Sequence, residues 1–276
     1  MSLKIFHRRP PFRPFSWMIP VCLILISACT VHKAPTITTD RLSLSAILER
    51  SDRQDLVKKD VKGSARIKVQ SPDGSYSSAC AVMLRYPDAI RVETIPPFGP
   101  PNLFLAINGA ALNIYLPGKG EFYTGSANVT NISRFLPFPL DAQELIPILL
   151  GVLPQNFFPS GAFLETDEDN GLYRINALFN GKPIRSCWID PLSGDLQKIE
   201  FLGLDGKTLY SAKITNHKRI DGVSLPQHVE FRFVAPGKAD LFLSVNYSEL
   251  KVFSGEDGNS VYDLELPPGI MPIPLD

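Results

Sequence analysis

The chain has 276 residues, with 28 lysines and arginines against 28 aspartates and glutamates, and it is 44% hydrophobic, 20% charged and 10% aromatic. A net charge of zero argues against nucleic-acid binding, because phosphates require a basic face. The apolar fraction suits a globular core and is too high for a disordered chain. The length allows one large all-β domain with an appendage.

Residues 1–28 predict an export signal. The segment 1–16 contains no acid and four basic residues, which are Lys4, Arg8, Arg9 and Arg13. The apolar run 17–26 follows, and a run of about ten apolar residues is typical of a secretory signal, whereas about twenty are needed to span a bilayer. The pair at 8–9 also allows a twin-arginine signal, although the prolines at 10–11 depart from that motif.

The end of this signal resembles the bacterial lipobox. Ile26, Ser27 and Ala28 precede Cys29, and the resemblance implies cleavage before Cys29, diacylglycerol on its sulfur and acylation of the new amino terminus. Several acyl chains hold a protein stably on a membrane. Thr30 follows Cys29, at the position where an Asp would keep a lipoprotein from being exported to the outer membrane. By resemblance to known sorting rules, its absence implies attachment to the outer membrane, on the side that faces the periplasm. The alternatives are an ordinary secretory signal or an uncleaved anchor that contains a cysteine.

Cleavage changes the charge balance of the chain. Removing the four basic residues of the signal from 28 leaves 24 against 28 acidic residues, a net charge of −4. The acidic body gains little from anionic headgroups, so the lipid on Cys29 must hold it. Residues 29–41 lack periodicity and predict a tether, whose polar stretch 30–40 reaches at most about 36 Å.

The pattern of the mature chain is mainly β. A helix is predicted over 42–58, with Leu44, Ile47 and Leu48 on one face. From Lys62 onward the apolar period changes to two, and seven Asn-Gly or Asp-Gly pairs interrupt it, as type I′ hairpins require. About eleven strands are expected, at 65–69, 82–84, 90–92, 103–107, 112–116, 173–179, 184–188, 199–201, 210–214, 229–233 and 241–247.

One apolar insertion, 131–154, separates the two sets of strands. Asp141 and Glu144 match a capping box, and Gly151 is a natural helix stop. The residues between them are apolar on nearly all sides. Pro147 predicts a kink or two short helices. The insertion is equally compatible with a movable lid and with a fixed plug.

The expected fold is an incomplete antiparallel β-barrel of about eleven strands, closed by the helical insertion, because so large a sheet twists and curls. A two-sheet sandwich is the alternative. The domains follow as a signal peptide (1–28), a lipidated tether (29–41), the barrel domain (42–250) and a Pro-rich extension (251–276). We expect a monomer.

No motif for catalysis or metal binding is present in the sequence. The mature histidines lack metal-ligand spacing, and neither a P-loop nor a Gly-x-Ser-x-Gly motif occurs. We therefore expect neither an enzyme nor a metal site, and no cofactor besides the covalent lipid on Cys29. Cys80 and Cys187 lie in predicted strands, and both a disulfide and two buried thiols are possible.

The order of these elements resembles the LolA/LolB family of lipoprotein carriers and acceptors over most of residues 42–250. Two segments carry the resemblance most specifically. The segment 91–105 resembles the LolB strand–loop–strand with its exposed apolar tip, and 136–154 resembles the helical lid of the family. The stiff prolines around the tip and the extension after 250 depart from the family pattern.

The resemblance implies an apolar cavity that receives acyl chains or lipoproteins from a soluble periplasmic carrier. Phe98, between Pro97 and Gly99, is then a tip that inserts into lipid or a partner, or else it packs on a neighbouring strand end. The implied lid residues are Leu145, Ile146, Pro147, Leu149 and Leu150. The expected cavity lining is Ile67, Val69, Val82, Leu84, Ile90, Val92, Leu105, Ile114, Trp188, Phe201, Phe231 and Phe233. The same residues would also fill an ordinary core, and for each one alone core packing is the favoured interpretation. The alternative function is a non-catalytic envelope interaction protein whose core is filled.

Overall fold

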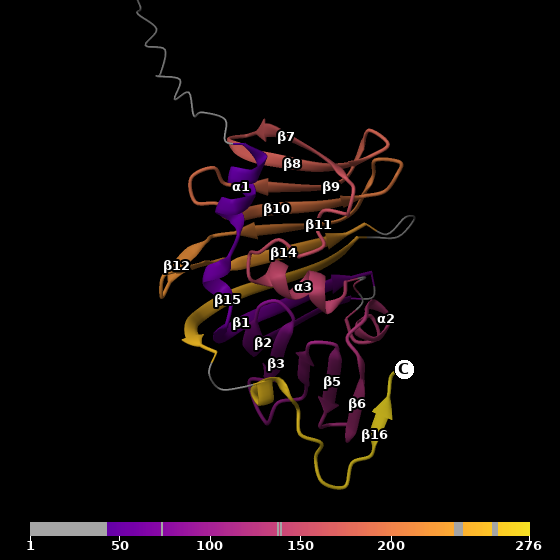
Figure 1. Cartoon of the computed structure of the whole chain (residues 1–276). Helices are drawn as coiled ribbons and strands as arrows, with labels where there is room; N and C mark the ends of the chain where they lie inside the picture. Colours follow the sequence, from indigo (N-terminus) through magenta and orange to yellow (C-terminus); the bar gives the residue numbers. More distant parts are fainter. Residues whose placement is uncertain (1–42, 73, 137, 139, 235–239, 256–258) are drawn as a thin grey trace, which may run out of the picture. The chain divides into compact units, whose positions relative to one another are not determined.

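The computed structural model describes residues 43–72, 74–136, 138, 140–234, 240–255 and 259–276, and Figure 1 shows the arrangement of their elements. Within these residues, fourteen strands pair into one sheet that does not close on itself. From edge to edge the order is β16 (Pro272–Pro274), β6 (Glu121–Ser126), β5 (Ala111–Leu116), β4 (Phe104–Asn108), β3 (Ala89–Ile95), β2 (Gly74–Arg85), β1 (Lys59–Ser71), β15 (Leu241–Ser254), β14 (His228–Phe233), β11 (Thr208–Thr215), β10 (Leu196–Leu202), β9 (Lys182–Ile189), β8 (Leu172–Phe179) and β7 (Phe163–Asp169).

Every neighbouring pair in this sheet is antiparallel except β6 and β16, which run parallel. The connections between consecutive strands therefore alternate between the two ends of the sheet. The β3–β4, β8–β9 and β10–β11 connections share one end, which we call the Phe98 end. A separate hairpin consists of β12 (Lys218–Ile220) and β13 (Val223–Leu225).

The helices are few and short among the described residues. They are α1 (Leu44–Ser51), α2 (Val129–Ile132), α3 (Ala142–Leu149) and the 3-10 helices η1 (Gln54–Leu56) and η2 (Asn259–Tyr262). Figure 1 shows α3 lying across the sheet in front of β14 and β15. The hydroxyl of Tyr247 on β15 donates a 3.2 Å hydrogen bond to the carbonyl of Leu149, which fixes the end of α3 there.

The mainly β, open-barrel prediction is confirmed, but the strand count was too low. The expected strands lacked β6, β7 and β16, as well as the β12–β13 hairpin. The helix expected over 42–58 ends at Ser51, because the residues after it are polar until Leu56 and offer no further apolar face. Three of the expected turns, at 170–171, 180–181 and 221–222, have positive φ at both residues, as a type I′ turn requires.

The segment after residue 250 belongs to the same compact unit as the sheet. β15 continues to Ser254, and the chain then returns along β3 and β4 to β6, beside which β16 forms the edge of the sheet (Figure 1). Its last residue is fixed there, because Asp276 accepts hydrogen bonds from the amide of Ser126 at 2.7 Å and from Nδ2 of Asn131 at 2.7 Å. These hydrogen bonds hold the pKa of the Asp276 side chain below its usual value.

Candidate functional site

An apolar cavity of about 360 Å³ lies on the concave face of the first half of the sheet. This volume falls within the range of small-molecule sites, roughly 300–1,000 Å³. Strands β1–β5 and β15 form one wall, and α2, α3 and the residues that follow α2 form the other. The lining residues are Ile67, Val69, Tyr76, Cys80, Ile90, Val92, Thr94, Leu103, Leu105, Ile107, Leu112, Ile114, Ile132, Phe135, Leu136, Leu145, Leu149, Leu243 and Val245.

No lining residue carries a charge. Tyr76, Cys80 and Thr94 supply the polar side-chain atoms of the wall, and burial raises the pKa of the Cys80 thiol. The hydroxyl of Thr94 is already hydrogen-bonded within the protein, as described below. A charged or strongly polar ligand would lose its water without gaining partners, so this wall favours hydrocarbon.

The local sequence of α3 explains why this helix starts and stops where it does. Asp141 Oδ1 accepts a 2.9 Å hydrogen bond from the amide of Glu144, which confirms the expected N-cap. At the other end Gly151 has a φ of +74°, and the amides of Gly151 and Val152 donate to the carbonyls of Ile148 and Pro147. This is a Schellman cap, so the expected stop at Gly151 is also confirmed.

Pro147 does not divide α3 into two short helices, which was one of the two expected outcomes. α3 is one continuous helix of eight residues with Pro147 inside it. A proline here removes only the hydrogen bond to the carbonyl of Gln143, and because Gln143 is exposed, water can satisfy that carbonyl.

The five residues expected to form the lid are all buried. Leu145 and Leu149 face the cavity, whereas Ile146, Pro147 and Leu150 do not line it. Because Ile146 is completely buried and Tyr247 binds the carbonyl of Leu149, α3 is packed on both of its sides. In this structure α3 is a buried wall of the cavity.

The loop between β3 and β4 projects Phe98 into solvent. The Phe98 side chain is 93% exposed, its neighbours Pro97 and Gly99 are exposed, and Gly99 has a φ of +86°. Phe98 therefore does not pack on a strand end. Thr94 fixes the base of the loop, since its hydroxyl donates to Oδ1 of Asn102 at 2.6 Å and accepts from the amides of Asn102 and Leu103 at 3.1 Å.

The same loop base lies beside the cavity. Thr94 and Leu103 line the cavity at the Phe98 end of the sheet, and Tyr76, which is 54% exposed, lines it from the start of β2. A half-exposed lining residue marks the side from which a ligand can enter. The entrance, marked by Tyr76 on β2, therefore lies at the same end of the sheet as the exposed tip.

Six of the twelve residues expected to line a cavity do so, namely Ile67, Val69, Ile90, Val92, Leu105 and Ile114. Val82 and Leu84 lie on the same face of β2 as Cys80, but they are packed in the core and do not line the cavity. Trp188 follows the inward Cys187, so it faces the other side of the sheet, where its Nε1 donates to Asp169 Oδ2 at 2.7 Å and Lys198 lies 4.2 Å from the ring centre.

The remaining three, Phe201, Phe231 and Phe233, belong to an aromatic core under the other half of the sheet. Phe138 from the insertion stacks on Phe233 at 4.8 Å between ring centres, and Phe157 meets Phe201 edge to face at 5.4 Å. The insertion therefore fills one half of the concave face and leaves the other half hollow.

Most of the lining residues that were missed had a readable signal. Five of them lie in expected strands, and three of these five are two residues from an expected lining residue, on the same face of the strand. The five are Leu103, Ile107, Leu112, Leu243 and Val245. Ile132, Phe135 and Leu136 had no such signal, because they occupy and follow a helix of one turn. Cys80 and Cys187 are both buried free thiols, so the disulfide alternative is wrong. Cys29, the signal and the tether lie outside the described residues.

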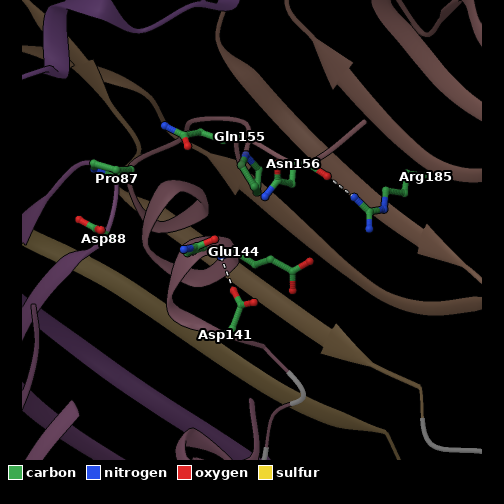
Figure 2. Close-up of a pocket in the computed structure, with 9 residues that line it drawn as sticks. Pro87, Asp88, Asp141, Glu144, Gln155, Asn156 and Arg185 are labelled. Atoms are coloured by element: carbon green, nitrogen blue, oxygen red, sulfur yellow. Dashed lines mark hydrogen bonds between the residues drawn. The ribbon is translucent and has the colours of Figure 1, made fainter. Parts of the chain in front are cut away.

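A second, polar pocket of about 140 Å³ lies beside the start of α3, and Figure 2 shows its residues. Asp88, Asp141, Glu144 and Arg185 line it. Burial, with the nearby charge of Asp141, raises the pKa of Glu144. Arg185 donates to the backbone carbonyls of Asn156 and Phe157, the latter at 2.8 Å, and so ties the segment after α3 to β9.

Two further properties of the described residues bear on the site. No group of three or more histidine, cysteine or acidic side chains within them is placed to hold a metal ion. None of the helices in that part of the chain is both long and apolar enough to cross a bilayer.

No protein-family model and no curated protein sequence matches the chain. Solved structures do resemble it. A LolA superfamily protein from Nitrosomonas europaea is 12% identical with a TM-score of 0.53, over 81% of this chain and 98% of its own. A putative outer membrane lipoprotein-sorting protein domain from Vibrio parahaemolyticus is 13% identical with a TM-score of 0.54, over 78% and 93%.

A DUF1329 family protein from Desulfovibrio piger is 11% identical with a TM-score of 0.58, over 79% of this chain and 94% of its own. At such identities the likeness concerns the fold alone. The chain therefore has a LolA-like open β-barrel, as the sequence resemblance predicted.

Proposed function

We propose that this protein is a membrane-anchored carrier or acceptor that holds acyl chains, of lipids or of lipoproteins, in its apolar cavity. The observation that carries the proposal is the uncharged cavity of about 360 Å³ with its half-exposed lining residue Tyr76 at the Phe98 end of the sheet. Hydrocarbon is the chemistry that this wall accommodates without leaving a buried polar group unpaired. The protein acts by binding and release, not by catalysis.

The path of the ligand follows from the position of the loop. Phe98 enters the apolar layer of a bilayer or a groove of a partner, because a large aromatic side chain left in water at the end of a rigid loop gains by burial. An acyl chain then passes Tyr76 and Leu103 into the cavity. A lipoprotein would arrive from a soluble periplasmic carrier and leave to the membrane.

The proposed location is the periplasmic face of the outer membrane. Cleavage before Cys29 and its lipidation attach the protein through acyl chains. The mature chain has a net charge of −4, so attraction to anionic headgroups adds little and the lipid is the main anchor.

Mass spectrometry of lipid that co-purifies with the unlipidated protein tests the cavity. Val69→Trp fills the cavity from β1, whereas Lys68→Trp places the same ring on the outer face of the same strand. We expect bound lipid in the wild type and in Lys68→Trp and its loss in Val69→Trp. If the wild type binds neither natural nor added lipid, the proposal is contradicted and the alternative, a non-catalytic interaction protein, is favoured.

Transfer of a lipoprotein from a soluble carrier to membranes tests the tip. Phe98→Glu is compared with Leu192→Glu, because both side chains are more than 80% exposed but lie at opposite ends of the sheet. We expect transfer to fall at least about tenfold with Phe98→Glu and to be unchanged with Leu192→Glu. Equal transfer by all three proteins, or transfer no faster than in buffer, contradicts the acceptor role.

A further inference from the structure

A second group of exposed apolar side chains lies at the Phe98 end of the sheet, on strands remote from the cavity. Phe163 is 68% exposed, Phe179 is 53%, Leu204 is 67% and Leu209 is 50%. We call these four residues the hairpin corner. Isolated exposed hydrophobic residues are ordinary, but a group on adjacent hairpins marks an interaction surface.

The four side chains come from neighbouring elements. Phe163 begins β7 and pairs with Leu178, next to Phe179 at the end of β8. The β8–β9 and β10–β11 turns lie side by side at the right of Figure 1, and Lys182 Nζ is 3.5 Å from the carbonyl oxygen of Leu204. Leu209 follows the second turn on β11. Because Phe163 pairs with Leu178, Phe163 and Phe179 project from opposite faces of the sheet, so the corner is the shared end of these neighbouring strands.

Lysines flank this surface. Lys182 is exposed beside Phe179, and the side chain of Lys207 is 84% exposed beside Leu204. Asp205 lies 3.4 Å from Lys207 and partly balances its charge. Apolar tips with flanking ammonium groups match the boundary between acyl chains and anionic headgroups.

We propose that the hairpin corner is a second membrane contact, at which Phe163, Phe179, Leu204 and Leu209 dip into a bilayer that contains anionic lipid. By strand pairing the corner lies at the same end of the sheet as Phe98. The inference uses the membrane attachment of the proposed function but not the cavity.

The proposed lipid anchor permits this orientation. α1 is held at the opposite end of the sheet, where Arg50 Nη1 donates to the carbonyl of Pro191 at 2.6 Å. Strand β9 has eight residues and spans about 26 Å. Residues 30–42, which follow Cys29, extend to roughly 45 Å. The chain before α1 is thus long enough for Cys29 and the hairpin corner to reach the same bilayer.

A dye that reports polarity tests the contact directly. Leu204→Cys carries the dye in the mature chain whose Cys29 is replaced by Ser, which removes both the lipid and a competing thiol. Leu192→Cys at the opposite end in the same background is the control, and the native Cys80 and Cys187 are buried. With vesicles of phosphatidylethanolamine and phosphatidylglycerol we expect a blue shift at position 204 and none at 192. The absence of a shift at 204, or equal shifts at both positions, overturns the proposal.

Vesicle flotation measures the contribution of the corner to binding. We expect Phe163→Ser combined with Leu204→Ser to weaken binding at least about tenfold, and Leu192→Ser to leave it unchanged. Lys182→Gln combined with Lys207→Gln should weaken binding to anionic vesicles but not to phosphatidylcholine vesicles. Unchanged flotation of the double serine variant overturns the membrane contact, and a simultaneous change in its oligomeric mass would assign the corner to contact between copies.

Lipid bound in the cavity is measured on the same samples, which separates the two proposals. A serine variant that loses vesicle binding but keeps its bound lipid supports the hairpin corner. A wild type that binds vesicles through the corner but never carries cavity lipid contradicts the proposed function and leaves this inference standing.

Discussion

The hydroxyl of Tyr262 donates a 2.7 Å hydrogen bond to Oδ1 of the fully buried Asp60, across 202 residues of sequence. Arg85 completes the arrangement, because it donates to both oxygens of Asp60 at 2.7 and 2.9 Å and lies over the Tyr262 ring. The C-terminal segment is therefore fastened to the start of β1 through a charge that would be costly to leave unpaired.

Replacing Tyr262 by Phe should destabilise the protein by about 2 kcal/mol, because a hydrogen bond to a buried carboxylate is lost while the ring still packs. Denaturant unfolding at neutral pH measures this loss. Tyr76→Phe is the control, since Tyr76 is half exposed. A loss no larger than that of the control would show that the hydroxyl does not fasten the segment.

Lowering the pH should remove most of the difference in unfolding free energy between the wild type and Tyr262→Phe. Burial alone would raise the pKa of Asp60, but the hydrogen bonds from Arg85 and Tyr262 outweigh it and lower the pKa below its ordinary value. A lowered carboxyl pKa contributes stability above roughly pH 4, and the contribution is lost as the pH falls through the lowered value. The gap in unfolding free energy between the wild type and Tyr262→Phe should narrow from pH 7 to pH 3, and a constant gap would contradict this linkage.

At Gly63 the neighbouring backbone leaves no room for a side chain. A Cβ on Gly63 would lie 1.7 Å from the carbonyl oxygen of Glu249, next to the bulge where β1 and β15 change register between Ser64 and Ala65. Gly63→Ala should cost about 3 kcal/mol or more, since strands must separate to admit a methyl group. Gly118→Ala, with open space around its Cβ, should change stability by less than about 0.5 kcal/mol. Equal thermal midpoints for both variants would refute the close approach.

The strands that could be predicted are those whose inner face is apolar at every second residue. β6 was missed because only Phe122 among its side chains is buried, and β7 because an edge strand has few neighbours to pack against and is acidic along most of its length. β16 contains Pro272 and Pro274, which lack backbone donors, and it pairs only at the sheet edge. The strands at the two edges of the sheet, together with β6 next to one edge, are thus the part of this fold that periodicity does not reveal.

The sequence predicts that one face of the sheet is apolar and concave. It does not predict which part of that face is hollow. Period two separates inward from outward residues, and Ile67, Val92 and Ile114 were found by it. It cannot say which inward residues another segment covers. Phe138 from the insertion covers Phe233, and Phe157, which follows the insertion, covers Phe201; that docking depends on tertiary packing.

Cys80 offers a native probe of the cavity. It lines the cavity and is only 2% exposed, while Cys187 is fully buried outside it. A small apolar maleimide should modify Cys80 slowly and Cys187 hardly at all, and an added fatty acid should protect Cys80. Because burial raises the Cys80 pKa above the usual 9.0, the rate should still be rising with pH at pH 9. Cys80→Ala is the control, and modification that fatty acid does not slow would place the lipid elsewhere.

Thr94 joins the exposed tip to the cavity, so its loss should affect both. Thr94→Val keeps the shape of the side chain but removes the hydroxyl that holds Asn102 and Leu103, which should cost about 1–2 kcal/mol in unfolding free energy. With the base of the loop released, Phe98 is less well positioned, and vesicle binding should weaken in proportion. Thr94→Ser keeps the hydroxyl and should bind vesicles like the wild type. If Thr94→Val is destabilised but binds vesicles as tightly as Thr94→Ser, the tip acts without a rigid base, and the stiffness of this loop has no part in membrane contact.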